Sequence, residues 1–157
     1  MSEVRLHCGS EEEQAALGAR LARAVGEQPA VVHLTGDLGA GKTTLVRGFL
    51  RGLGHAGPVR SPTYTLVEPY PLEGLTLYHL DLYRLGDPEE LEYLGLRDLL
   101  AEPALIFVEW PERGRGWLPA PDLEIVIRHQ DEGRMLDFIS RSPVGERWLQ
   151  ALMQGKT

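Results

Sequence analysis

The sequence predicts an α/β fold in which a mixed central sheet is flanked by helices, and three observations support this prediction. Two short apolar runs, at 30–35 and 104–108, have the length and composition of buried parallel strands. Segments with helical spacing of apolar residues alternate with strand patterns along the chain. Near the C-terminus, 122–128 and 134–140 flank a turn at 131–133 and are expected to form an antiparallel hairpin. We therefore expect antiparallel strands to be added to the sheet by the C-terminal part.

The first half of the chain carries clear start and stop signals. Residues 4–7 alternate and predict a short strand, and Ser10 with Glu13 forms a capping box before a helix that ends near Gly26. The expected core contacts of that helix are Ala15, Leu17, Leu21, Ala22 and Val25. A second helix follows the strand at 30–35 and is expected to end at about Leu53, where glycines cluster.

Similar local signals predict the helices and strands of the second half of the chain. A polar loop over 60–65 leads into a strand near Val67, and another strand is expected over 75–81. Asp87 and Pro88 mark a helix start, as N-cap and first helical residue. After the strand at 104–108, the Pro/Gly-rich residues 111–121 are expected to form a loop, and a helix over 143–152 follows the hairpin. A chain of 157 residues is about one domain, so we expect 1–157 to fold as one unit.

The composition limits the classes of function. A formal net charge of −7 argues against autonomous nucleic-acid binding, although a protein partner could still hold nucleic acid. No stretch approaches the ~18 apolar residues of a membrane helix, and the N-terminal residues lack the features of a signal peptide. Cys8 is the only cysteine, so no internal disulfide can form. These observations lead us to expect a cytoplasmic protein.

Residues 36–43 read Gly-Asp-Leu-Gly-Ala-Gly-Lys-Thr, a complete phosphate-binding loop of the form G-x-x-x-x-G-K-[ST]. Its glycines allow backbone N–H groups to approach an anion. Lys42 is expected to reach the β- and γ-phosphates, and the Thr43 hydroxyl to ligate Mg²⁺. A strand, a glycine loop and a helix in this order predict a P-loop NTPase-like fold. The predicted nucleotide-binding residues of the loop are Gly36, Asp37, Leu38, Gly39, Ala40, Gly41, Lys42, Thr43 and Thr44.

A P-loop needs further groups that position Mg²⁺ and the attacking water, and two carboxylates lie where such groups are expected. In open α/β sheets these groups stand at the carboxyl ends of strands, and Asp81 and Glu109 each end a predicted strand. The four apolar residues before Glu109 match a Walker B pattern, with Glu in place of Asp. Either carboxylate could bind Mg²⁺, and Glu109 could instead polarise a water. The predicted catalytic residues are Lys42, Asp81 and Glu109, and the predicted metal ligands are Thr43, Asp81 and Glu109.

Three other features each admit two interpretations. The loop over 60–65 carries the hydroxyls of Ser61, Thr63 and Thr65, and it is either a switch that senses the γ-phosphate or an ordinary turn. Trp110 either stacks on a base or substrate or belongs to the core. Several arginines are either phosphate or base contacts or solvated surface residues: Arg84, Arg113, Arg115 and Arg134.

Several segments, taken together and in order, resemble the bacterial TsaE family of tRNA threonylcarbamoyladenosine biosynthesis proteins, also called YjeE. They are the P-loop with Thr44, Ser61-Pro62-Thr63-Tyr64-Thr65-Leu66-Val67, His79-Leu80-Asp81-Leu82-Tyr83-Arg84-Leu85, Asp87-Pro88-Glu89-Glu90-Leu91 and Glu109-Trp110. The P-loop alone marks only a superfamily, whereas the other blocks are much more specific. The segment after about Gly145 adds little to the resemblance.

The resemblance implies a small ATPase that uses ATP and Mg²⁺. It implies that Thr43 and Glu109 surround the metal, that Asp81 is a further essential acid and that Trp110 lies near the nucleotide. It also places Arg134 near the nucleotide, and the region of Ser10 and Glu11 near the adenine. The implied partners are TsaB and TsaD, and tRNA is reached indirectly through their complex. ATP hydrolysis is expected to reset this complex between turnovers of N6-threonylcarbamoyladenosine (t6A) synthesis.

Two alternative functions remain open on the sequence. A small-molecule kinase would need an Arg-rich lid, for which Arg113-Gly114-Arg115-Gly116 is a short candidate. A nucleotide-dependent interaction switch would need partner docking, and a slow ATPase that controls partner affinity satisfies both descriptions. The chain contains no Asn, so the Asn-Lys-x-Asp motif for guanine cannot occur and guanine specificity is not expected.

Overall fold

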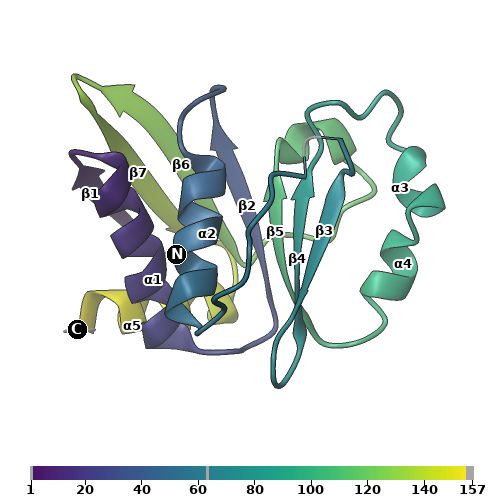
Figure 1. The fold of residues 1–157 in the computed structure, drawn as a ribbon, viewed down its shortest axis with the longest axis horizontal. Helices are drawn as coiled ribbons and strands as arrows, with labels where there is room; N and C mark the ends of the chain where they lie inside the picture. The colour runs from purple at the N-terminus through teal and green to yellow at the C-terminus, as the bar shows by residue number, and fades with distance from the viewer. Residues whose placement is uncertain (1, 63, 155–157) are drawn as a thin grey trace.

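The computed structural model describes residues 2–62 and 64–154 (Figure 1). Its strands are β1 Glu3–Cys8, β2 Ala30–Gly36, β3 Val67–Pro71, β4 Thr76–Asp81, β5 Ala104–Glu109, β6 Leu123–Gln130 and β7 Gly133–Ser140. Its helices are α1 Glu11–Val25, α2 Lys42–Gly52, α3 Glu90–Tyr93, α4 Leu96–Leu99 and α5 Pro143–Gln154, with a 3-10 turn η1 at Pro111–Gly114. Within these ranges, every helix is too short or too polar to cross a membrane.

The strands form a mixed sheet in the order β1-β7-β6-β2-β5-β4-β3. The central strands β4, β5, β2 and β6 are parallel, whereas β7 and β1 on one side and β3 on the other are antiparallel to their neighbours. The predicted α/β class, with helices around a mixed sheet and antiparallel strands from the C-terminal part, is confirmed.

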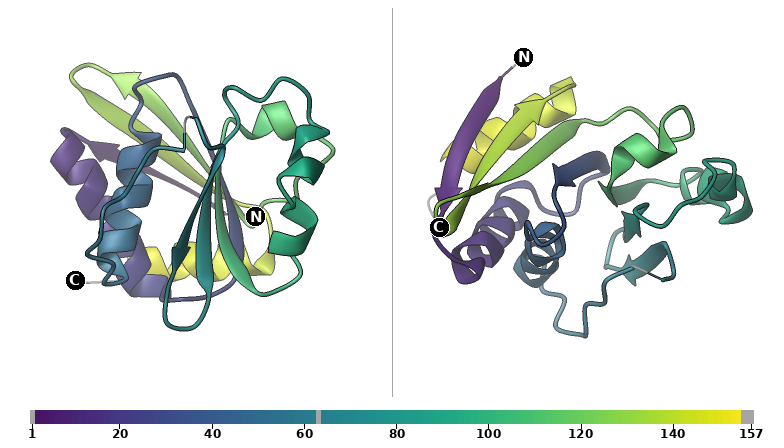
Figure 2. Two further views of the ribbon diagram at one scale, coloured as in Figure 1. Left: turned by 45° about the vertical axis from the view of Figure 1, so that its right-hand side comes forward. Right: turned by 90° about the horizontal axis from the view of Figure 1, so that it is seen from above.

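One large core lies under α1, α2 and α5. Helices α1 and α2 run side by side on one face of the sheet (Figures 1 and 2). They approach closely because Gly48 has no side chain: a Cβ there would lie 2.0 Å from the carbonyl oxygen of Ala15. Helix α5 crosses the lower end of the molecule in Figure 1 and stacks Trp148 on Phe49 of α2, with ring centroids 5.9 Å apart. These contacts hold α2, the helix that follows the P-loop, against the sheet.

A smaller core lies on the other face of β4 and β5. Leu91 of α3 and Leu96 of α4 are buried there together with Ile106 and Val108 of β5. Both helices are short, and Figure 2 shows them at the β3–β4 side of the molecule, away from α1 and α2. They cover this face of β4 and β5, the two strands that end in the predicted acids Asp81 and Glu109.

Most element boundaries lie within one or two residues of the predictions, and those after β4 differ most. The strand expected near Val67 does begin at that residue, because 64–66 form a turn whose Leu66 N–H donates to the Pro62 carbonyl. The helix expected from Asp87 begins at Glu90, although the Asp87 carboxylate does accept the Glu89 N–H at 2.9 Å. The loop expected over 111–121 starts with the 3-10 turn η1. Of the predicted capping box, Ser10 accepts the Glu13 N–H, whereas the Glu13 carboxylate accepts the N–H of Gly9, one residue before the N-cap.

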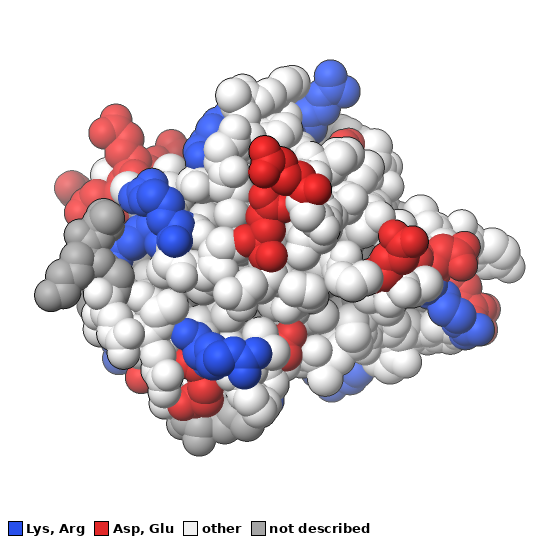
Figure 3. All heavy atoms as spheres, turned by 90° about the horizontal axis from the view of Figure 1, so that it is seen from below, with Lys and Arg blue, Asp and Glu red and all other residues white. Residues whose placement is uncertain are grey.

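Charged residues of both signs are scattered over the lower end of the molecule. In Figure 3, acidic and basic side chains are interspersed there with uncharged surface, and neither sign forms a continuous patch among the described residues. The opposite end gathers the P-loop and the carboxyl ends of β2, β4 and β5 (Figure 1). That edge of the sheet is where the predicted site residues meet.

Candidate nucleotide site

The P-loop connects β2 to α2, and two of its glycines adopt conformations that favour glycine. Gly39 has φ 79° and Gly41 has φ 96°, which is the left-handed region. Helix α2 begins at Lys42, so its N-terminal partial positive charge faces the loop. The Lys42 ammonium donates to the Gly36 carbonyl at 2.5 Å and lies 4.1 Å from the centroid of the Trp110 ring. The loop therefore has the geometry and the charge of an anion site.

Gln14 of α1 orients two peptide groups of the loop. Its side-chain amide donates to the carbonyls of Ala40 at 3.1 Å and of Gly41 at 2.8 Å, and the side chain is 2% exposed. In a trans peptide the C=O and the following N–H point in opposite directions. The N–H groups of Gly41 and Lys42 therefore point away from Gln14. A Cβ on Gly41 would lie 2.3 Å from the Gln14 amide nitrogen, so this arrangement also requires a glycine at 41.

The residues predicted near the nucleotide surround the loop on its α1 and hairpin side. Arg134, at the start of β7, donates to the Gly39 carbonyl at 3.2 Å. Thr44 donates to the carboxylate of Glu11 at 3.2 Å and so joins α2 to α1. A hollow of about 260 Å³ lies here, and Ser10, Glu11 and Arg134 line it together with the loop residues 39–41. The structure thus brings these predicted residues together, and their contact with adenine stays a prediction.

The Thr43 hydroxyl, Glu109 and His79 form a connected group at the ends of β4 and β5. Thr43 Oγ1 donates to Glu109 Oε2 at 2.9 Å, and His79 Nε2 lies 2.5 Å from the same carboxylate oxygen. Glu109 is 4% exposed and His79 is fully buried. Both contacts use Oε2, and Glu109 is one of the residues that line the pocket in front of the P-loop.

Asp81 stands beside Glu109 because the two residues are register partners on adjacent parallel strands. One Asp81 oxygen accepts the Tyr83 N–H at 3.1 Å. Burial raises the pKa of Asp81, the hydrogen bond from Tyr83 lowers it, and the charge of Glu109 raises it again; the net shift is upward. Two buried acids side by side therefore repel each other and favour a cation between or in front of them.

Lys42 brings a positive charge close to these two negatively charged carboxylates. Burial lowers the pKa of Lys42, while the nearby carboxylates of Glu109 and Asp81 raise it, and the net shift is downward. A pocket of about 290 Å³ lies here, and its walls include Lys42, Asp81 and Glu109. Glu11, residues 38–44, Ser61 and Trp110 complete it. All three predicted catalytic residues thus face one space.

The oxygen atoms at this edge fit Mg²⁺. This ion prefers oxygen ligands and is commonly held by one or two carboxylates together with substrate phosphates. Thr43, Asp81 and Glu109 offer a hydroxyl and two carboxylates next to a phosphate-binding loop. Among the described residues, no group of three or more His, Cys, Asp or Glu side chains could hold a metal by itself. A metal that takes further ligands from phosphate is the kind these residues suit.

Trp110 lies at the pocket wall. Its φ of 57° is unusual for a bulky residue and turns the chain from β5 into η1. The indole is half-buried, faces the Lys42 ammonium and contacts the Tyr83 ring, with centroids 5.0 Å apart. Trp110 lines the pocket and also packs against the smaller core, so its stacking on a base or substrate stays a prediction.

The structure locates the loop over 60–65 and the arginines but does not decide their function. Ser61 lines the pocket, Thr65 donates to Glu68 at 3.2 Å, and Thr63 lies outside the described residues. Arg113 lies over the rings of Tyr83 and Trp110, at 5.1 and 5.9 Å from their centroids. Arg84 lies 4.8 Å from the Tyr64 ring centroid. Arg113 is therefore engaged with aromatic rings, and the switch function of the loop stays a prediction.

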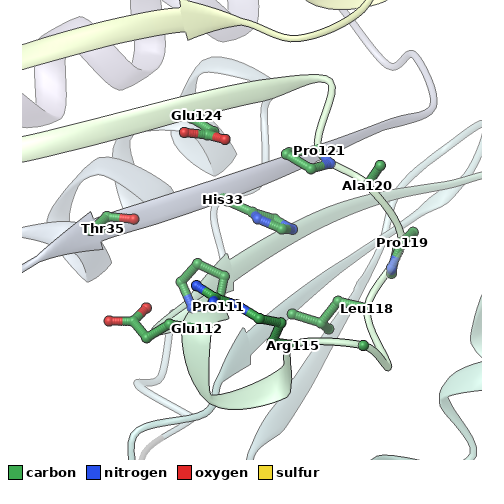
Figure 4. A pocket seen from close by; sticks show the side chains of 11 residues that line it. His33, Thr35, Pro111, Glu112, Arg115, Leu118, Pro119, Ala120, Pro121 and Glu124 are labelled. Carbon is green, nitrogen blue, oxygen red and sulfur yellow. The ribbon is translucent and has the colours of Figure 1, made fainter.

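A larger hollow of about 480 Å³ lies behind β2 and contains none of the P-loop residues (Figure 4). His33 and Thr35 of β2, Glu124 of β6 and the segment from η1 to Pro121 line it. Successive side chains of a strand point to opposite faces, and Val32 and Leu34 belong to the core under α1 and α2. His33 and Thr35 therefore face away from α2, so volume alone does not locate the nucleotide site.

Two residues with clear roles in this geometry, Gln14 and His79, were not among the predicted site residues. In both cases the sequence pattern placed a polar residue on a face that was expected to be buried. Gln14 is a polar residue at a spacing that faces the core of α1, three residues before Leu17. His79 stands two residues before Asp81, so the strand period places both side chains on one face. A polar residue on a buried face needs a partner, and for these two the partner is the P-loop or Glu109.

Comparisons with known proteins agree with one another. The profile of a family described as "Threonylcarbamoyl adenosine biosynthesis protein TsaE" matches residues 8–136. A Haemophilus influenzae protein named tRNA threonylcarbamoyladenosine biosynthesis protein TsaE is 49% identical over 125 residues, which cover 80% of this chain and 79% of that protein. A Bacillus subtilis protein of the same name is 38% identical over 149 residues, covering 94% and 90%. The crystal structure of Bacillus subtilis YdiB matches with a TM-score of 0.81 and 32% identity, over 98% of this chain and 95% of that one.

Proposed function

The chain belongs to the TsaE family of threonylcarbamoyl adenosine biosynthesis proteins, and we propose that it is the ATP-binding, Mg²⁺-dependent ATPase of the t6A machinery. In this proposal it acts with TsaB and TsaD and resets their complex between turnovers. Membership of the family assigns the chain to t6A biosynthesis. The ATPase activity and the partners are the proposal.

One observation carries the proposal: the Thr43 hydroxyl of the P-loop is hydrogen-bonded to Glu109, within the same pocket as Lys42 and Asp81. Phosphoryl transfer needs little covalent chemistry from a protein and depends on positioning and charge. A P-loop lysine, a hydroxyl and two strand-end acids around one space supply both. Lys42 offers its charge to the β- and γ-phosphates, and the N–H groups of Gly41 and Lys42 point away from Gln14, where they can bind phosphate oxygens.

Asp81 has one task in this mechanism, and Glu109 has one of two. Mg²⁺, when bound, neutralises charge that develops on the phosphate oxygens. Thr43 and Asp81 provide oxygen ligands for the ion, while Glu109 either joins them or accepts a hydrogen bond from the attacking water and orients it. The buried position of Glu109, with Oε2 already occupied by hydrogen bonds, limits the carboxylate to one direction. That fixed orientation suits the positioning of a single water.

Nucleotide titration tests the binding part of the proposal. Titration calorimetry with ATP and with GTP, each with and without Mg²⁺, should show tight binding of ATP only, strengthened by Mg²⁺ and lost in Lys42→Ala. Equal affinity for GTP, or affinity independent of Lys42, would contradict it. The alternative of a small-molecule kinase is distinguished by the product, because an ATPase releases phosphate in the absence of any acceptor. A docking switch without turnover would release none.

A further inference from the structure

His79 of β4 is a fully buried histidine whose hydrogen bonding is concentrated on one residue. Its Nε2 lies 2.5 Å from Glu109 Oε2, and its Nδ1 is buried without a partner among the described residues. Burying a polar group without a hydrogen bond costs free energy. A histidine selected only to fill this space would be less favourable than an apolar residue such as Leu77, which faces the same core two residues earlier. The contact with Glu109 is therefore the feature that accounts for an imidazole here.

The geometry also determines which carboxylate oxygen remains available. Glu109 Oε2 receives both the Thr43 hydroxyl and the His79 contact, whereas Oε1 has no hydrogen bond to the described residues, and Glu109 is one of the residues that line the pocket. A carboxylate accepts hydrogen bonds and does not donate them, so this pattern places a proton on His79 Nε2. In the proposed function the Thr43 oxygen serves Mg²⁺. The Thr43 O–H can still donate to Glu109 while its oxygen ligates the ion, so His79 is the second protein group that holds Oε2.

We propose that His79 is a positioning residue for Glu109, which holds Oε2 so that Oε1 faces the phosphate end of the pocket. This inference rests on the proposed ATPase function and adds a residue to it. Partners of this kind, which orient a ligand or a catalytic carboxylate without touching the substrate, commonly change metal affinity or activity by about 10- to 100-fold when removed. His79→Phe keeps a ring in the buried space and removes the donor. It should lower the rate of ATP hydrolysis by about that factor.

The test uses four variants and two measurements. ATP hydrolysis is measured together with the increase in nucleotide affinity that Mg²⁺ produces, which is a binding readout independent of turnover. His79→Phe should lose most of both. His79→Gln, whose amide nitrogen stands about as far from the backbone as Nε2, should recover much of the loss, whereas His79→Asn, whose amide is one carbon shorter, should not. His129→Phe, on an exposed residue of the hairpin strand β6, is the matched control and should leave both unchanged.

A double-mutant cycle separates positioning from damage to the fold. In a Glu109→Gln background, His79→Phe should have almost no further effect, because residues that act as a unit are not additive. Additive losses, or a Gln variant no better than the Asn variant, would overturn the proposal. If His79→Phe does not fold, the comparison of Gln with Asn decides. A wild-type protein that binds and hydrolyses ATP alongside an unimpaired, folded His79→Phe variant contradicts only this inference; a wild type that does neither contradicts the proposed function.

Discussion

The Thr43 hydroxyl donates a hydrogen bond to Glu109 Oε2 at 2.9 Å and joins the P-loop to the end of β5 across 66 positions of the sequence. Neither residue is close to the other along the chain. They meet because β2 and β5 are parallel neighbours, so that the loop after β2 and the last residue of β5 lie at one edge of the sheet. This contact organises the candidate site, and the predictions below concern the groups around it.

Glu109→Gln should reduce ATP hydrolysis by about 10²- to 10⁴-fold, the usual contribution of a positioned general base, with little change in affinity for ATP without Mg²⁺. Glutamine keeps the shape of the side chain and removes its charge. Phosphate release measures the rate, and Glu73→Gln on the exposed turn between β3 and β4 is the control. Hydrolysis at the wild-type rate would exclude Glu109 from catalysis.

Asp81→Asn should stabilise the nucleotide-free protein at neutral pH. The folded-state pKa of Asp81 is raised, chiefly by burial, so the folded protein holds this proton more tightly than the unfolded chain. The ionised carboxylate therefore costs stability above the folded-state pKa, and the cost disappears as the pH falls towards the ordinary value of 3.8. Thermal melts of both proteins should show a higher Tm for the variant at pH 7 and a difference that shrinks in acid. A lower Tm of the variant at pH 7 would contradict this account.

Gln14→Leu should weaken ATP binding by about tenfold, since two hydrogen bonds that orient the loop carbonyls are lost. Gln28→Leu, at an exposed residue, is the matched control. Calorimetric titration gives the affinities, and circular dichroism checks that the fold is kept. The role assigned to Gln14 fails if the folded Gln14→Leu protein binds ATP as tightly as the Gln28→Leu protein.

Arg5→Leu should make the protein more sensitive to acid. A hydrogen bond from Arg5 at 2.6 Å lowers the pKa of Asp137 on β7, and Arg128 contributes at 2.8 Å. A lowered carboxylate pKa stabilises the fold above the unfolded value of 3.8 and loses this effect as the pH falls through the folded value. Acid titration followed by circular dichroism should place the unfolding midpoint of the variant at a higher pH than that of wild type. An unchanged midpoint would mean that Arg5 adds nothing to the stability of this strand pair.

The fold class followed from local patterns. The apolar runs at β2 and β5, the glycine loop and the C-terminal hairpin were each visible in short windows of sequence, and the mixed sheet that they predict is confirmed. The pairing of β1 with β7 could not be predicted, because their register depends on contacts between residues such as Leu6 and Leu136 that lie far apart in the sequence. The short α3 and α4 were predicted poorly at their ends because tight turns surround them.

Part of the candidate site could likewise be predicted from local sequence patterns, and part could not. A motif with fixed spacing marked the P-loop, and two strand-end positions marked Asp81 and Glu109, which the structure brings to one pocket. Gln14 and His79 belong to elements whose function is defined only by what they touch in the folded chain. Their contacts with the loop carbonyls and with Glu109 arise from packing of α1 on α2 and of β4 on β5. Polar residues on buried faces were the signal available in advance.

Partner-dependent ATP turnover tests the central proposal most directly. Steady-state ATP hydrolysis is measured for the purified protein alone and with the TsaB–TsaD complex, with Lys42→Ala as the control. We predict slow hydrolysis alone, strong stimulation by the complex, and loss of both in the variant. Failure of the protein to bind the complex, with no change in the rate of hydrolysis, would contradict the proposed ATPase role in t6A synthesis.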